Sequence, residues 1–148
     1  METLILDYFF TEYPNCELIQ FGYQFFNIFS NLAFLVVAYL LYQKAGAARW
    51  LSCLIILSSA GSLLHHLWPL NETVPFDVLP AVAVAILALL QSFRKLSLND
   101  WLVVAIVGLA GFLALCSDTF LCDTFAVGTH FLWHLFAAYV LFLLGRKI

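Results

Sequence analysis

Five apolar segments, each about as long as a lipid bilayer is thick, constrain this chain more than any other feature. A helix needs roughly 20 mostly apolar residues to cross the hydrocarbon core of a membrane, with a range of about 17–25. The segments run approximately over residues 24–42, 50–67, 76–93, 101–116 and 128–144. The stretches between them carry the Gly, Pro, Asn and charged residues that are typical of turns. The sequence therefore predicts an all-α fold, a polytopic membrane helix bundle with about five transmembrane helices.

The composition agrees with that class and excludes others. Hydrophobic residues make up 64% of the chain and charged residues 10%, whereas soluble domains carry roughly 25% charged residues. The length of 148 residues fits one integral membrane domain over 1–148, with 1–23 as an outer N-terminal segment. Only 6 Lys and Arg are present, so we expect no nucleic-acid partner. Residues 1–13 suit either a helix in the membrane interface or a disordered tail.

The charges orient the predicted helices. With five spans, all 6 Lys and Arg residues fall at one end of the bundle, after the first, third and fifth spans. The positive-inside rule makes that end cytoplasmic. Of the 9 acidic residues, all but Asp100 lie at or beyond the other end. An even number of spans would scatter the basic residues, so the pattern supports five spans, with the N-terminus outside and the C-terminus inside.

Polar residues that are rare in such a chain are predicted to meet at the outer end of the bundle. His66 lies near the end of the second span, ~25 Å from its inner end at a rise of 1.5 Å per residue. Asp77 opens the third span, which starts outside. His130 and His134 lie in the first two turns of the fifth span and, being four residues apart, face the same side of one helix. Three helices thus bring these four side chains to one depth.

This arrangement predicts a catalytic zinc site. Three His ligands with water in the fourth position are typical of catalytic zinc, and two of the imidazoles have the helical spacing that suits one ion. We therefore expect His66, His130 and His134 as metal ligands. Zinc lowers the pKa of its bound water to roughly 7. Asp77 could then act as general acid and base, and the Ser62 hydroxyl could stabilise an oxyanion.

Each of these residues also has a purely structural interpretation. An HxxxH pair is by itself a weak signal for a metal, although ionisable residues inside a membrane span are costly and usually functional. Ser62 could bond back to its own helix, and Asp77 could cap its helix. For His65, about 100° around the helix from His66, we expect a structural hydrogen bond to a neighbouring helix. Interhelical hydrogen bonds are also one interpretation of three polar residues in the first span: Asn27, Ser30 and Asn31.

The motifs, taken together, resemble those of the alkaline ceramidase family. In chain order they are "CE" at Cys16–Glu17, "NIFSN" at Asn27–Asn31, "GSLLHH" ending at His66, "DVLP" at Asp77–Pro80 and "HFLWHL" at His130–Leu135. The family belongs to a superfamily of seven-helix membrane hydrolases that includes the adiponectin/progestin receptors and haemolysin III-like proteins. Its signature, S-x-x-x-H, then Asp, then H-x-x-x-H, falls here on Ser62, His66, Asp77, His130 and His134. The motifs touch every part of the chain except the fourth span and its loops, and they are specific only as a set.

The resemblance implies an intramembrane zinc-dependent amidohydrolase of sphingolipid metabolism, which cleaves the amide of ceramide or a related membrane lipid. It implies zinc on His66, His130 and His134, with Asp77 as acid and base and Ser62 as oxyanion partner. The chain departs from the family in length. The interval between Asp77 and His130 has room for one span where the family has three, so part of the family's lipid-binding wall is not expected here.

The acidic calcium site of the family is matched only in part. Glu17 follows Cys16, but Pro14 precedes them and Gln24 stands where an acid would be expected. Calcium is therefore a weaker expectation than zinc.

The chain has 4 cysteines and no CxxC spacing, so a thiolate zinc site is not expected. Cys16, Cys116 and Cys122 lie on the outer, oxidising face in the predicted topology. We therefore expect a disulfide from Cys16 to Cys116 or Cys122. Cys53 lies inside the second span, where we expect a free, buried thiol.

Two other functions compete with hydrolysis. A receptor-like member of the same superfamily would share the metal site and differ in what the bound lipid does. A haem-binding protein would also place histidines on facing helices. An axial haem pair needs neither Ser62 nor Asp77, however, and His130 and His134 share one helix face and cannot lie on opposite sides of one haem.

Overall fold

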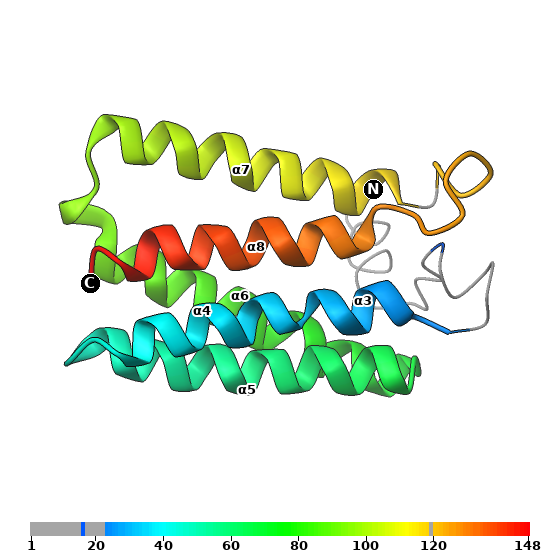
Figure 1. Ribbon diagram of the computed structural model, residues 1–148, viewed down its shortest axis with the longest axis horizontal. Coiled ribbons are helices and arrows are strands. Elements are labelled where there is room, and N and C mark those ends of the chain that lie inside the picture. Colours follow the sequence, from blue (N-terminus) through cyan, green and yellow to red (C-terminus); the bar gives the residue numbers. More distant parts are fainter. Residues whose placement is uncertain (1–15, 17–22, 119) are drawn as a thin grey trace, which may run out of the picture.

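The computed structural model describes residues 16, 23–118 and 120–148 of the chain. These residues form helices and turns, with no strand among them, which confirms the predicted all-α fold (Figure 1). The expectations for residues 1–13 and for Glu17 lie outside the described residues. In chain order the helices are α3 (Phe25–Ser30), α4 (Leu32–Tyr42), α5 (Ala47–Leu67), α6 (Val74–Ser92), α7 (Leu98–Ser117) and α8 (His130–Gly145), with the 3-10 turns η1 (Asn71–Thr73) and η2 (Phe93–Lys95) at the two ends of α6.

Each predicted span corresponds to one of these helices or to a pair of them. Helices α3 and α4 together form the first span, Phe25–Tyr42, which is interrupted at Asn31. The starts of α5 and α7 differ most from expectation, at 47 and 98 instead of 50 and 101. Four spans are long and apolar enough to cross a membrane, and α8 is a shorter apolar helix of 16 residues. These lengths and compositions suggest a membrane protein.

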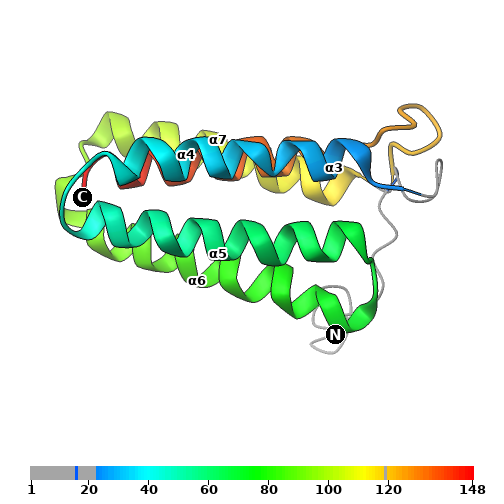
Figure 2. The same cartoon turned by 60° about the horizontal axis from the view of Figure 1, so that its bottom comes forward.

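The helices lie in two layers (Figure 2). Helices α5 and α6 lie side by side in one layer, and α3, α4 and α7 belong to the other. Helix α5 joins the layers by packing against α4. Helix α8 runs between α4 and α7, packs against both and also contacts α3 and α6 (Figure 1). Helices α6 and α7 both contact α8 but do not pack closely against each other.

A buried apolar core fills the half of the bundle that contains the C-terminus. It joins α4, α5, α6 and α8 through side chains that include Leu41, Ile55, Ala88 and Leu144. The outer surface of the bundle is apolar as well, since many large side chains such as those of Leu90 and Ile106 are exposed. A surface of this kind suits contact with lipid chains rather than with water.

The expectation for Cys53 was half right. The residue is a free thiol, as predicted, but it is exposed rather than buried. The buried face of α5 passes through the neighbouring positions Ser52 and Ile55. Cys53 lies on the outward side because successive residues are turned by about 100° around the helix.

At the end of the bundle that contains the C-terminus, Asp100 forms ion pairs with two of the basic side chains. Ser97 and Asp100 form a capping box at the start of α7, which satisfies backbone N–H groups that have no partner within the helix. The same carboxylate accepts from Arg146 at 3.1 Å and from Lys147 at 2.7 Å. The single acid at the basic end therefore ties α7 to the residues that follow α8.

Helices α5 and α6 approach each other closely at the end of the bundle opposite the C-terminus. A Cβ atom at position 61 would collide with the carbonyl oxygen of Phe76, so only glycine lets the two backbones come this near. Gly61 directly precedes Ser62, and Phe76 directly precedes Asp77. The glycine thus brings the ends of α5 and α6 that carry these two polar residues together.

The helix order puts the α5–α6 turn and the α4–α5 turn at opposite ends of the bundle, which makes the predicted orientation testable. In a background that lacks the free thiols (Cys53→Ser, Cys116→Ser), we expect Glu72→Cys to react with a membrane-impermeant maleimide in intact cells. The matched variant Ala45→Cys should react only after permeabilisation, because positive residues flank its turn. The reverse labelling pattern would overturn the orientation.

Candidate metal centre

Three imidazoles converge inside the half of the bundle opposite the C-terminus. His66 lies in the last turn of α5, and His130 and His134 lie in the first turns of α8. One ring nitrogen from each of the three lies within 4.8 Å of the others, and the Nε2 atoms of His66 and His134 are 3.2 Å apart. The three predicted ligands are therefore close enough together to hold one metal ion.

A buried amide orients the first of these rings. Gln24 Oε1 lies 2.5 Å from His66 Nδ1 and also accepts from Asn27 Nδ2 at 3.3 Å. An amide oxygen only accepts hydrogen bonds, so His66 Nδ1 must carry the hydrogen. Its Nε2 then presents a lone pair to the cluster.

A buried hydroxyl orients the second ring in the same sense. Ser30 Oγ lies 2.7 Å from His134 Nδ1 and donates its hydrogen to the carbonyl oxygen of Asn27 at 2.9 Å. Because that hydrogen is used, His134 Nδ1 must donate to Ser30, and its Nε2 also carries a lone pair. Two Nε2 lone pairs that face each other repel, and a cation between them removes the repulsion. The donor set thus fits a metal that takes imidazole nitrogen.

The predicted catalytic residues lie at the same place. Asp77 and Ser62 line one cavity of about 450 Å³ together with His130 and His134. Ser62 is buried and its hydroxyl has no hydrogen-bond partner among the described residues, so the bond back to its own helix is not formed. Asp77 lies in the first turn of α6, whose N-cap position is Thr73, so it is not the capping residue. Both side chains are left available to the cavity.

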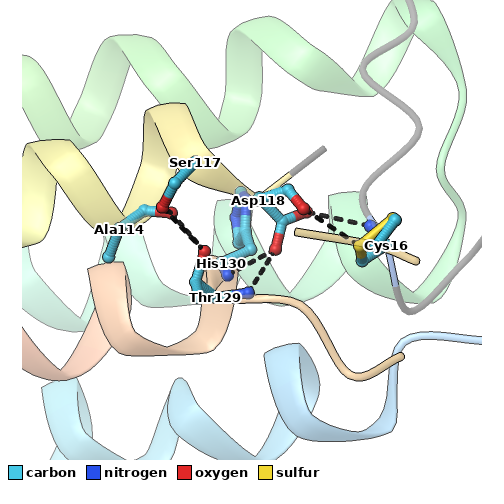
Figure 3. Close-up of a disulfide and its surroundings, with 7 residues drawn as sticks. Cys16, Ala114, Ser117, Asp118, Thr129 and His130 are labelled. Atoms are coloured by element: carbon cyan, nitrogen blue, oxygen red, sulfur yellow. Dashed lines mark hydrogen bonds between the residues drawn. A yellow bond between two sulfur atoms is a disulfide. The ribbon is translucent and has the colours of Figure 1, made fainter. Parts of the chain in front are cut away.

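Asp118, which follows the fourth predicted span, is a buried acid beside the start of α8. It ends α7 as a wholly buried residue. Its Oδ1 accepts from the backbone N–H groups of Thr129 at 2.5 Å and His130 at 2.7 Å, and its Oδ2 from that of Cys16 at 2.9 Å (Figure 3). A carboxylate at this place satisfies the N-terminus of α8 and complements the helix dipole. It therefore fixes the backbone of His130, one of the predicted ligands.

The disulfide lies against this carboxylate. Cys16 pairs with Cys122, with a Cα–Cα distance of 5.1 Å, and Cys116 is free. Of the two predicted pairings, Cys16–Cys122 is thus the one that forms. Gly128 allows Cys16, Asp118 and the start of α8 to meet in one joint. Its φ of +68° favours glycine, and a side chain at this position would collide with Asp118 and Cys16. The joint connects the described part of the N-terminal segment to the start of α8.

The remaining polar residues divide between structural and site roles. His65 makes a structural hydrogen bond, but to Thr73 Oγ1 at 2.9 Å, in the turn η1 that leads into α6, rather than to the body of a neighbouring helix. Asn31 bonds within its own segment through its Nδ2 to Asn27. Ser30 makes the interhelical hydrogen bond that was one interpretation of it, and its partner is the ring of the predicted ligand His134.

Two contributors were missed as site residues in the sequence. Gln24 was noted only as a departure from a calcium site, although a buried amide in a membrane span is itself a signal. Asp118 has no such local signal, because only the folded chain brings it to His130. Comparisons of the chain with protein-family models, with characterised proteins and with solved structures found no match.

We expect Asp118→Ala to destabilise the protein strongly. The change leaves three backbone N–H groups without their acceptor, and each unsatisfied buried group costs about 1–3 kcal/mol. Thermal unfolding in detergent should show a melting temperature well below that of wild type. Asp123→Ala is the matched control, because this acid of the same loop is exposed and surface changes usually stay within about 0.5 kcal/mol. Equal melting of the two variants would contradict the assigned role.

Proposed function

We propose that the chain is an intramembrane zinc-dependent amidohydrolase that cleaves a lipid amide, with ceramide as the first amide to test. The observation that carries the proposal is the convergence of three imidazoles, two of which, His130 and His134, line one cavity together with Asp77 and Ser62. Metal ligands, a carboxylate for proton transfer and a hydroxyl donor are the groups that metal-assisted hydrolysis requires. The resemblance of the motifs to those of alkaline ceramidases supports the same assignment.

The spacing of the cluster supports zinc as the metal. Two nitrogens bound to one tetrahedral zinc ion at about 2.0–2.1 Å lie roughly 3.3–3.4 Å apart. The Nε2 atoms of His66 and His134 are 3.2 Å apart, and His130 would be the third ligand. Both ring nitrogens of His130 are buried without a partner among the described residues, so either is free to bind. When bound, zinc supplies a Lewis acid and an activated water at neutral pH.

The cavity supports a lipid as the substrate. Beyond the polar cluster, its wall consists of apolar and small side chains from α6, α7 and α8, among them Val82, Ala85, Gly108, Phe112 and Val140. A volume of about 450 Å³ is within the roughly 300–1,000 Å³ of small-molecule sites. Since α6 and α7 are not a closely packed pair, a membrane lipid can enter between them. A hydrocarbon chain would then lie in the apolar part with its amide at the histidines.

In the proposed reaction, water adds to the amide carbon and the carbon–nitrogen bond breaks. Asp77 takes a proton from the attacking water and passes it to the departing amine, so that one carboxylate serves as base and then as acid. The Ser62 hydroxyl donates a hydrogen bond to the carbonyl oxygen as that oxygen gains negative charge. Gln24 and Ser30 hold two of the ligand rings in place throughout.

The metal assignment predicts one zinc ion per chain, measurable by elemental analysis of the purified protein. We expect the double variant His66→Ala/His134→Ala to lose the metal, because it removes two of three ligands. His65→Ala is the matched control for metal content, since this neighbouring histidine lies outside the ligand cluster. Full zinc occupancy in the double variant would refute the assignment.

The mechanism predicts different losses for the two cavity residues. Asp77→Asn should keep zinc and the helical circular dichroism spectrum while turnover falls by about 10²–10⁴, the usual contribution of a general acid and base. Ser62→Ala should lose less, because other groups still stabilise the carbonyl oxygen. Release of fatty acid from ceramide and from simpler fatty amides is the measurement, with Glu72→Gln as the exposed control acid.

Two results would contradict the proposal in different ways. Wild-type rates in Asp77→Asn would exclude this acid from proton transfer and leave the reaction itself standing. A zinc-loaded wild-type protein that hydrolyses no lipid amide would exclude the reaction and favour the receptor-like alternative.

A further inference from the structure

One histidine of the outer end has no part in the metal cluster. His65 lines the cavity together with Asp77 and Ser62, but it is not among the three residues whose nitrogens converge. Its ring centroid lies 5.4 Å from that of His66, so it sits beside the cluster. Among the described residues, Thr73 is its only hydrogen-bond partner.

The bond to Thr73 decides which nitrogen of His65 carries the hydrogen. Thr73 Oγ1 lies 2.8 Å from the carbonyl oxygen of Trp68 and 2.7 Å from that of Leu70, and carbonyls only accept. The single hydroxyl hydrogen therefore goes to one of these carbonyls. The Leu70 N–H donates to the same hydroxyl oxygen at 3.2 Å, which leaves it one lone pair for His65. His65 Nδ1 must then donate, and the Nε2 of the neutral ring keeps a lone pair.

We propose that His65 Nε2 accepts a hydrogen bond from a hydroxyl group on the amine half of the lipid, an inference that rests on the proposed function. The lone pair belongs to a ring that lines the cavity and has no acceptor role within the described protein. In the proposed reaction Asp77 protonates the amide nitrogen, so the donor that His65 binds is a different group of the lipid. His65 lies at the polar end of the cavity, whereas the apolar wall from α6 to α8 suits the acyl chain. Ceramide, the first amide proposed above, carries hydroxyl groups on its amine half, and His65 would be the residue that recognises this part of it.

A matched pair of lipids tests this recognition. N-oleoylethanolamine carries a hydroxyl where N-oleoylpropylamine has a methyl group, and the two are otherwise alike. Their binding is measured on zinc-loaded Asp77→Asn protein, in which turnover should fall by about 10²–10⁴. We expect the hydroxylated amide to bind about fivefold more tightly, the usual effect of one neutral hydrogen bond. Adding His65→Phe should bring the ratio of the two affinities close to one.

Two further variants separate recognition from a merely structural effect. His65→Gln retains an acceptor oxygen and should restore part of the preference. Leu64→Phe changes an exposed side chain of the same helical turn and should keep the full preference.

Three results would each overturn the inference. With His65 intact, the protein would bind the two amides equally or bind neither of them, or the preference would survive His65→Phe. Hydrolysis is followed separately on protein that retains Asp77. A hydroxyl preference in binding without any hydrolysis would refute the proposed reaction and leave the recognition by His65 intact.

Discussion

The hydrogen bonds that the Nδ1 atoms of His66 and His134 make to Gln24 and Ser30 decide whether the histidine cluster can hold a cation. Without Gln24 and Ser30, each ring could place its hydrogen on Nε2 and block the cluster. With them, both Nε2 lone pairs face one point. Both partners are also uncharged, so they orient the rings without adding negative charge, unlike the carboxylate partners of many metal-bound histidines. A cation held here would keep more of its charge for polarising a substrate.

Helix α8 carries two of the three proposed ligands, and a carboxylate holds each of its ends. Asp118 binds the backbone of His130 at the start of the helix, and Asp100 binds Arg146 and Lys147 just beyond its end. Both acids come from the ends of α7, with which α8 packs along its length. Sliding of α8 along the bundle would break bonds at both ends. A helix of only 16 residues thus gains a fixed register, which the geometry of the metal cluster requires.

The apolar segments and the spacing of the histidines were sufficient to predict the helices, their ends to within three residues, and the convergence of His66, His130 and His134. These properties depend on local periodicity and on the alternating direction of successive spans. The partner of each ring could not be predicted, because contacts such as the one between Gln24 and His66 depend on how helices rotate about their axes. The role of Asp118 could not be predicted for a similar reason, because its three bonds cross from the end of α7 to two distant segments.

The short interval between α6 and α8 has a consequence for how the cavity is closed. Family resemblance implies two further helices in this interval, and here α7 alone crosses it. Helices α6 and α7 each line the cavity, yet they pack against α5 and α8 rather than closely against each other. Small residues on these walls, such as Ala85 and Gly108, provide little bulk to seal the space between them. In a membrane, lipid chains would complete this wall, so the proposed substrate would reach the site from within the bilayer rather than from water.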